Sequence, residues 1–272
     1  MTEDNGRYLT VDGALCSGHR PEGVRVITSY ECERNCRFCY QEQRHSVKLY
    51  PKKLHEHLQD MAARTFIPIY FTFQGGEIST HPDHALQLFS VADKVFPQVF
   101  RKSLTSNGYG DPAFYQKAKL YGITHITLSL HGVNNRVAEL ALRLARDGFY
   151  TVRINCFLHR DLLANARAVY RFCRDANIQL TLCEDLRPDC MDPPTPDEVK
   201  EHVLQGDANS YVFRSYKHQD VWTNPTRNYR FWVYHHADHY DYNNLIVLPD
   251  GSLTMAFDDV MVCAGAGESD AA

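Results

Sequence analysis

Short apolar runs alternate with amphipathic stretches from residue 24 to residue 183, and this alternation restricts the fold more than any other feature of the chain. Short apolar runs bounded by turn residues predict strands, and the longer amphipathic stretches predict helices. Repeated strand and helix units are typical of a parallel sheet with crossover helices. We therefore predict an α/β fold, a partial (β/α)6 TIM-like barrel with a small C-terminal β appendage. The predicted strands are 24–29, 67–74, 100–106, 125–131, 151–157 and 178–183, and the predicted helices are 50–64, 81–95, 112–121, 137–147 and 164–176.

Polar and apolar side chains alternate along three of the predicted strands. Successive side chains point to opposite faces of a strand, so in a barrel one set packs on the helices and the other lines the interior. A closed barrel fills its interior with branched apolar side chains. The polar sets therefore predict an open interior that holds a polar ligand, with the active site at the C-terminal strand ends. The apolar sets are Ile69, Phe71 and Phe73, then Ile126, Leu128 and Leu130, then Val152 and Ile154; the polar sets are Tyr70, Thr72 and Gln74, then Thr127, Ser129 and His131, then Arg153 and Asn155.

The remainder of the chain predicts additions to one main domain. A proline-rich segment starts at Arg187 and reads as a linker. After it, the aromatic-rich stretch 229–234 and a hairpin at 245–257, which turns at 249–251, indicate an added β element. We expect an N-terminal extension at 1–23, the barrel at 24–186, the linker and C-terminal element at 187–260, and a disordered tail at 261–272.

Composition limits the compartment and the partners. The net charge of -4 provides no basic face for a nucleic-acid duplex, and no apolar run is long enough to span a membrane. The N-terminus lacks the basic-then-apolar pattern of a targeting segment, so we expect a cytoplasmic protein. Nine cysteines without a secretory signal indicate metal binding in a reducing compartment before they indicate disulfides.

Three of the cysteines lie in one loop directly after the first predicted strand. Cys32, Cys36 and Cys39 have the spacing C-x3-C-x2-C. Because all-protein 4Fe-4S clusters use four cysteine ligands, three cysteines hold three irons and leave the fourth open to an exogenous ligand. A zinc site is the alternative, although zinc prefers four protein ligands and no second ligand pair follows at a suitable distance.

This spacing, with the aromatic Phe38 before the last cysteine, resembles the radical S-adenosylmethionine (radical SAM) superfamily. Gln74-Gly75-Gly76-Glu77 at the end of the second strand is similar to the GGE motif of that superfamily. The resemblance extends to about Cys183. It implies one 4Fe-4S cluster, held by the three cysteines, and S-adenosylmethionine, contacted by Phe38, Gly75, Gly76 and Glu77.

The later strand ends resemble the GTP 3′,8-cyclase of molybdenum-cofactor synthesis and its relatives. In that branch these ends touch the ribose and the substrate. The resemblance implies that Arg153 faces an anionic substrate group. A surface ion pair is the alternative reading of Arg153. The cofactor contacts implied on these strands are Thr105, Ser106, Asn107, Ser129, His131 and Asn155.

The resemblance also implies a reaction. A one-electron donor of the flavodoxin or ferredoxin type would reduce the cluster, S-adenosylmethionine would be cleaved to a 5′-deoxyadenosyl radical, and the radical would abstract hydrogen from the substrate. We expect a small polar substrate, such as a nucleotide or sugar derivative. Glu184 is a candidate acid, base or ribose ligand, and Cys263 or Cys156 a candidate hydrogen donor to a product radical. A buried, inert thiol is the alternative for each cysteine.

The C-terminal hairpin resembles the SPASM or twitch extension of the same branch, but Met255 and Phe257 stand where a cysteine is usual. We therefore expect a remnant without a second cluster. An extra cluster at Cys183, Cys190 and Cys263, and a metal site in the tract 234–241, remain alternatives.

Three other functions compete with a metabolite enzyme. A peptide-modifying maturase usually needs a leader-recognition domain or an auxiliary cluster, and the 23 residues before the first strand are too short for such a domain. An activase of a glycyl-radical enzyme would need a partner surface around the barrel mouth. In a non-catalytic metal-binding module the cysteine loop would be structural.

Overall fold

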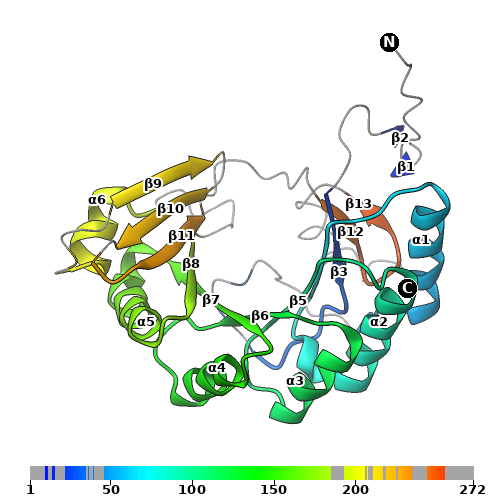
Figure 1. The fold of residues 1–272 in the computed structure, drawn as a ribbon, viewed down its shortest axis with the longest axis horizontal. Coiled ribbons are helices and arrows are strands. Elements are labelled where there is room, and N and C mark those ends of the chain that lie inside the picture. The colour runs from blue at the N-terminus through cyan, green and yellow to red at the C-terminus, as the bar shows by residue number, and fades with distance from the viewer. Residues whose placement is uncertain are drawn as a thin grey trace, which may run out of the picture.

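The structure is a computed structural model, and its described residues are 10–11, 14–15, 22–34, 36, 39, 46–184, 193–205, 207, 211–216, 219–224, 226–234 and 244–254. Within them, eleven strands form one sheet in the order β13-β12-β3-β4-β5-β6-β7-β8-β11-β10-β9, and β1 pairs with β2 separately. Figure 1 shows the sheet as an open crescent with the helices α1 to α5 on its convex side.

The elements of the barrel alternate along the chain as predicted, with boundaries that differ by at most three residues. The strands are β1 Thr10–Val11, β2 Ala14–Leu15, β3 Gly23–Ile27, β4 Tyr70–Gln74, β5 Arg101–Ser106, β6 His125–Ser129, β7 Thr151–Leu158, β8 Gln179–Glu184, β9 Tyr211–Tyr216, β10 Gln219–Asn224, β11 Tyr229–Tyr234, β12 Asn244–Val247 and β13 Leu253–Thr254. The helices are α1 Pro51–Ala63, α2 Pro82–Val95, α3 Pro112–Ala118, α4 Asn135–Asp147, α5 Leu163–Ala176 and α6 Pro196–Glu198, with short turns η1 Ile78–Thr80, η2 Lys119–Tyr121, η3 Arg160–Leu162 and η4 Val199–Val203.

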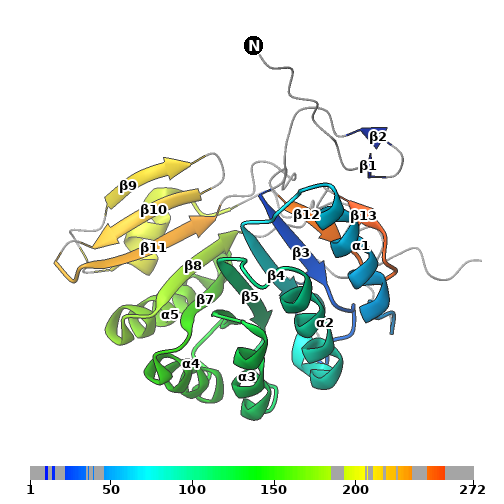
Figure 2. The same ribbon diagram turned by 45° about the vertical axis from the view of Figure 1, so that its right-hand side comes forward.

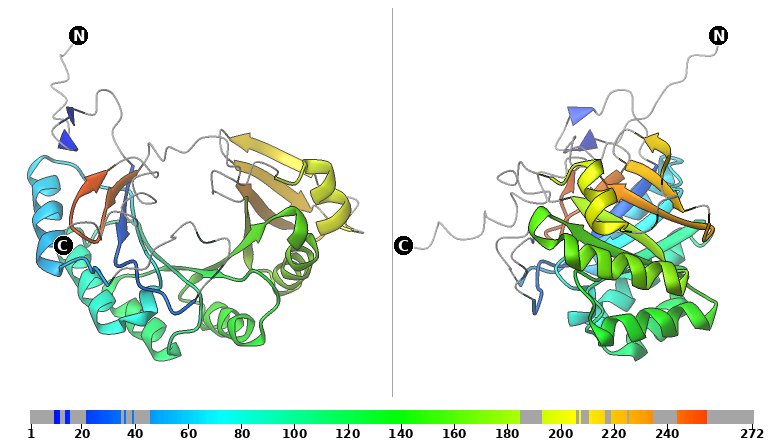
Figure 3. Two further views of the ribbon diagram at one scale, coloured as in Figure 1. Left: turned by 180° about the vertical axis from the view of Figure 1, so that it is seen from behind. Right: turned by 90° about the vertical axis from the view of Figure 1, so that its left-hand side faces the viewer.

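Strands β3 to β8 all pair in parallel, which confirms the predicted partial barrel. β12 adds in parallel beside β3, and β11 adds in parallel beside β8. The antiparallel strands β13 and β9 lie at the two edges, and a gap separates the two ends of the crescent in both views (Figures 1 and 3).

The C-terminal strands extend both edges of the barrel sheet. Leu245 of β12 pairs with Val24 of β3, and Phe231 of β11 pairs with Leu180 of β8. All four residues of β12 are buried, as expected for a strand covered on both faces. Figure 2 shows β12 and β13 beside α1, at the opposite end of the sheet from β9 to β11. The sequence predicted the strand at 229–234 and the hairpin, but not their places in the sheet.

Local capping sets the ends of α4. The side chain of Asn134 accepts a hydrogen bond of 3.3 Å from the backbone N–H of Val137, and α4 therefore begins two residues before the predicted start. Gly148 ends the helix in the left-handed conformation, at φ 72°. No described helix has the length and apolar character needed to cross a membrane.

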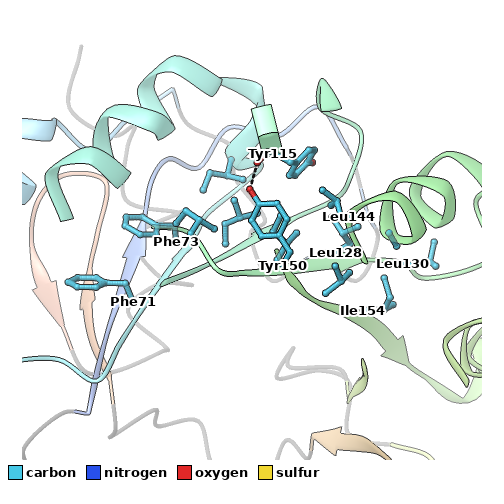
Figure 4. Packing of buried hydrophobic residues seen from close by; sticks show 14 of the residues in the cluster. Phe71, Phe73, Tyr115, Leu128, Leu130, Leu144, Tyr150 and Ile154 are labelled. Atoms are coloured by element: carbon cyan, nitrogen blue, oxygen red, sulfur yellow. Dashed lines mark hydrogen bonds between the residues drawn. The ribbon is translucent and has the colours of Figure 1, made fainter. Parts of the chain in front are cut away.

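The main core lies between the convex face of the sheet and the helices. Phe71, Phe73, Leu128 and Ile154 are fully buried there, which confirms the predicted apolar face (Figure 4). Ile69 differs from the prediction, because β4 begins only at Tyr70 and the Ile69 side chain is 57% exposed. The hydroxyl of Tyr150 donates to the carbonyl of Tyr115 and ties β7 to α3 within this layer.

Candidate functional site

The cysteine loop begins at the C-terminal edge of the parallel strands. After β3, the backbone N–H of Thr28 donates to the carbonyl of Gln74 at 2.7 Å. The N–H of Gly76 then donates to Ser29 at 2.8 Å, and that of Glu77 to Glu31 at 2.7 Å. The segment that leads into Cys32 is therefore aligned by the segment that follows β4.

Gly75 and Gly76 are required for this close approach. A Cβ on Gly76 would lie 2.1 Å from the carbonyl oxygen of Glu31, and one on Gly75 would lie 2.4 Å from that of Ser29. Gly75 also has φ 155°, which L side chains rarely adopt. Both glycines thus admit the backbone that precedes the cysteines, a role that the sequence did not reveal. Their contact with S-adenosylmethionine remains a prediction.

The three cysteines of the motif are partly buried. The backbone N–H of Cys39 donates to the carbonyl of Cys36 at 3.0 Å, and that of Arg34 donates to Sγ of Cys32 at 3.3 Å. Within the described residues, no three side chains of His, Cys, Asp or Glu gather closely enough for a single metal ion.

Glu77 is a buried carboxylate, and protein groups donate hydrogen bonds to both of its oxygens. Oε1 accepts from the N–H of Ser79 at 2.9 Å and its hydroxyl at 2.6 Å, and from the hydroxyl of Ser106 at 2.7 Å. Oε2 accepts from the N–H of Asn107 at 2.6 Å. Burial raises the pKa of Glu77, while these bonds oppose that rise. Glu77 thus joins the ends of β4 and β5.

Ser106 and Thr105 lie on opposite faces of β5. Ser106 is buried towards the helices and also shares a hydrogen bond of 2.7 Å with the hydroxyl of Tyr115. Thr105 lies on the interior face, as do Ser129 and Asn155 on their strands. Thr105, Ser129 and Asn155 are therefore on the face where a ligand in the crescent would meet them.

His131 follows β6 and is fixed by the neighbouring strand. Its Nδ1 accepts a hydrogen bond of 3.0 Å from the backbone N–H of Phe157. Burial lowers the pKa of His131 to about 4, and the nearby positive charge of Arg34 adds to this. The ring is therefore neutral at neutral pH, with its proton on Nε2.

Two arginines and a histidine lie on the interior face near the N-terminal ends of three adjacent strands. Nη2 of Arg153 donates to Oε1 of Gln179 at 3.3 Å, and its guanidinium carbon is 5.2 Å from the ring centroid of Trp232. Burial lowers the pKa of His125, and the charges of Arg101 and Arg153 add to this, so both arginines lie near it. Sequence reasoning missed Arg101 and His125, although their alternation with Lys102 and Ile126 placed them on the interior face.

A cavity of about 280 Å³ adjoins Arg153. Gln179 and Trp232, both contacted by Arg153, line this cavity together with Arg230. The cavity lies where β8 and β11 begin, at the edge of the sheet opposite the cysteine loop. It therefore continues the polar surface from Arg153 towards the N-terminal ends of the strands.

Two cysteines near the end of the barrel occupy different faces. Cys156 is fully buried among the helix-facing side chains and does not line the interior, which agrees with its reading as an inert buried thiol and not as a hydrogen donor. Cys183 alternates with Leu182 and shares the interior face with Thr181. Burial raises the pKa of Cys183 to about 12. Glu184 shares the strand face of Leu182 and is buried.

Several predicted residues lie outside the described part of the chain. They are Phe38, Cys190, Met255, Phe257, Cys263 and residues 235–241 of the histidine tract. Their predicted roles stay predictions.

One family model matches part of the chain in sequence. Residues 26–157 match the family model described as the Radical SAM superfamily. No curated protein matches the chain in sequence.

Three solved structures share the fold. SuiB of Streptococcus suis bound to the precursor peptide SuiA aligns with a TM-score of 0.63 and 12% identity, over 92% of this chain and 62% of that chain. Native anSMEcpe with bound AdoMet (S-adenosylmethionine) has a TM-score of 0.53 and 15% identity, over 66% of this chain and 58% of that one. BtrN in complex with AdoMet and 2-DOIA has a TM-score of 0.52 and 13% identity, over 89% of this chain and 76% of that one. The chain spans 41% to 62% of the length of the SuiB chains it matches.

The cysteine loop fits a 4Fe-4S cluster. Its donor set is three thiols on one loop, and a backbone N–H already points at one of the sulfurs. Gly75 and Gly76 leave no room for a side chain beneath the loop, so the backbone that leads into Cys32 is held in place.

Proposed function

We propose, from the match of residues 26–157 to the Radical SAM superfamily, that this chain is a radical SAM enzyme that abstracts a hydrogen atom from a small polar substrate carrying an anionic group. Its cofactors are a 4Fe-4S cluster and S-adenosylmethionine. When bound, the reduced cluster supplies a 5′-deoxyadenosyl radical by reductive cleavage of S-adenosylmethionine. The substrate class that we propose is a nucleotide or sugar derivative.

Two cations on the interior face are the observation that carries this proposal. Arg101 of β5 and Arg153 of β7 both lower the pKa of His125 on β6, the strand between them, so that ring is held neutral beside the two guanidinium groups. Cations in a partly buried site favour an anionic partner, because their field is screened less than in water. A guanidinium also matches the geometry of a carboxylate or phosphate.

Strand geometry limits the size of the substrate. Arg153 is five residues before Leu158, where β7 ends, and a strand rises about 3.3 Å per residue. A substrate whose anionic group binds Arg153 would therefore extend along the strands towards the cysteine loop. A nucleotide or a phosphorylated sugar has a suitable length.

The other interior side chains have polar roles in this proposal. Thr105, Ser129 and Asn155 would hydrogen-bond to S-adenosylmethionine or substrate, and neutral His131 would donate from Nε2. Gly75 and Gly76 would offer backbone groups to S-adenosylmethionine, and Glu77 and Ser106 would hold Asn107 in place. Phe38 is proposed to contact the cofactor, and Glu184 and Cys263 to act in later steps. We also propose a flavodoxin-type or ferredoxin-type electron donor and a cytoplasmic location.

A substrate screen tests this function. The protein is reconstituted anaerobically with iron and sulfide, reduced with S-adenosylmethionine present, and 5′-deoxyadenosine is measured with a panel of nucleotides, sugar phosphates and peptides. We expect a phosphorylated or carboxylated metabolite to accelerate its release, and the uncharged parent compound to have less effect.

Variants identify the anion contact. Arg153→Gln should raise KM for the anionic substrate by about tenfold or more, because a charged hydrogen bond contributes on the order of 1.5–3 kcal/mol. Arg143→Gln on the exposed face of α4 is the matched control and should leave KM unchanged. Release accelerated only by peptides would contradict the proposed substrate class and favour a peptide-modifying maturase.

A further inference from the structure

The two residues that follow Cys32 are held by the loop that follows β5. The Glu33 Oε1 atom accepts a hydrogen bond of 2.7 Å from Nδ2 of Asn107, and its Oε2 accepts one of 3.1 Å from the hydroxyl of Thr80. The guanidinium carbon of Arg34 lies 4.3 Å from the ring centroid of Tyr109. Glu33 and Arg34 follow the proposed ligand Cys32. They thus contact two different residues, Asn107 and Tyr109, of the loop that follows β5.

Asn107 is oriented by contacts on three sides. Its Oδ1 accepts from the backbone N–H of Tyr109 at 2.9 Å, so the amide nitrogen faces Glu33. Its own backbone N–H donates to the buried carboxylate of Glu77 at 2.6 Å. The side chain of Asn107 therefore links the cysteine loop to the end of β5 through hydrogen bonds of both its amide nitrogen and its amide oxygen.

Tyr109 is fixed on the far side by the start of α4. Its hydroxyl accepts from Nδ2 of Asn134 at 2.8 Å, and its carbonyl accepts from Nη2 of Arg136 at 2.7 Å. The ring that lies against Arg34 is therefore a fixed surface. A cation stacked on such a ring gains about 0.5–1 kcal/mol at an exposed site.

We propose that Asn107 and Tyr109 are positioning residues for the iron-sulfur cluster, acting through Glu33 and Arg34 to hold Cys32 and the two residues after it in the conformation that binds the cluster before metal arrives. The inference rests on the cluster of the radical SAM domain and not on the proposed substrate. Preorganised supporting contacts retain a bound metal because the ligands need no reordering.

A reciprocal exchange tests the Glu33 contact. Asn107→Asp keeps the acceptor for Tyr109 and places two carboxylates face to face, whereas adding Glu33→Gln restores a hydrogen bond with donor and acceptor exchanged. Asn165→Asp on the exposed face of α5 is the matched control, since it makes the same chemical change away from the cysteine loop. Tyr109→Leu removes the ring, and Tyr109→Phe keeps it.

The readouts use the reconstituted protein without S-adenosylmethionine or substrate. They are iron and sulfide per chain, the rate of iron loss to a chelator, the electron paramagnetic resonance spectrum of the reduced cluster, its midpoint potential, and the thermal unfolding midpoint of the iron-free protein. We expect Asn107→Asp to lose iron about tenfold faster and to shift the spectrum. The double variant and Asn165→Asp should behave as the wild type. Tyr109→Leu should lose iron faster, and Tyr109→Phe, which keeps the ring but loses its bond to Asn134, should lie between the two.

Three results would overturn the inference. The first is wild-type iron retention in Asn107→Asp, and the second is failure of Glu33→Gln to rescue it. The third is a loss of unfolding midpoint that accounts for the loss of iron, which would make the role merely structural. Cluster readouts that match expectation while no anionic substrate accelerates cleavage would contradict only the proposed function; a wild-type protein that binds no cluster would overturn both.

Discussion

Nδ1 of His131 accepts a hydrogen bond of 3.0 Å from the backbone N–H of Phe157, which joins the end of β6 to β7 at the interior face of the barrel. This bond uses the lone pair that a proton would otherwise take. Together with burial, this bond favours the neutral imidazole ring in the folded state.

The folded state should therefore lose stability in acid through His131. Its pKa is lowered from 6.5 to about 4, so the unfolded chain takes up the proton first. The contribution is complete above pH 6.5 and is lost as the pH falls towards 4, by on the order of 3 kcal/mol at most. Urea unfolding at pH 7.5 and pH 4.5 should show a larger loss for the wild type than for His131→Asn, which keeps an acceptor but does not titrate. Equal losses would show that His131 titrates normally.

Gly76→Ala should prevent cluster assembly. The added Cβ would lie 2.1 Å from the Glu31 carbonyl, and the backbone before Cys32 must move to admit it. Iron and sulfide analysis after reconstitution should give less than half the wild-type content, while circular dichroism shows a retained fold. Gly132→Ala, whose Cβ would have atoms of Asn165 as its nearest neighbours at 3.5 Å or more, should bind the wild-type amount. Full cluster content in Gly76→Ala would contradict the steric argument.

Each of Cys32→Ala, Cys36→Ala and Cys39→Ala should abolish cluster binding and 5′-deoxyadenosine formation. The ligands lie on a loop outside the core, so the unfolding midpoint of the iron-free protein should change little. Cys156→Ala should do the reverse, because that thiol is buried in the core: it should keep the cluster and lose about 1 kcal/mol of stability. A cluster retained in any of the three loop variants would show that the assigned ligand set is wrong.

Asp93→Asn should destabilise the fold. Lys102 is 2% exposed on the helix-facing side of β5 and pairs with Asp93 of α2, so removing the carboxylate leaves a buried ammonium without its counter-charge. We expect a loss of about 2 kcal/mol in the free energy of unfolding, discounted because Asp93 is partly exposed. Lys102→Met should cost less, since an apolar chain of similar length suits the site. A smaller loss in Asp93→Asn than in Lys102→Met would contradict this reading.

The strands and helices could be predicted because the spacing of apolar residues depends only on the order of residues along the chain. Phe71 and Phe73 alternate with polar residues, and both are buried towards the helices. Motif spacing was readable for the same reason, since Cys32, Cys36 and Cys39 lie within eight residues of one loop. The radical SAM match over residues 26–157 agrees with the family that these motifs indicated.

Contacts between distant segments were not readable in this way. One element of the C-terminal region has a local signal: Thr195 and Glu198 form a capping box that would have predicted the missed helix α6. By contrast, nothing local in the sequence indicated that β12 would pair with β3. This pairing depends on which strand edge keeps unpaired backbone groups once the barrel strands have formed their sheet.

The sequence by itself determined the α/β class, the cysteine loop and the polar interior face, because each depends on the order and period of neighbouring residues. Only the tertiary structure decided that Glu33 contacts Asn107 and that protein groups donate hydrogen bonds to both oxygens of Glu77. It also decided that Arg101 and Arg153 lie near His125. Those pairs lie many residues apart, and they meet because parallel strands bring their like ends to the same edge of the sheet and the register sets which side chains face each other.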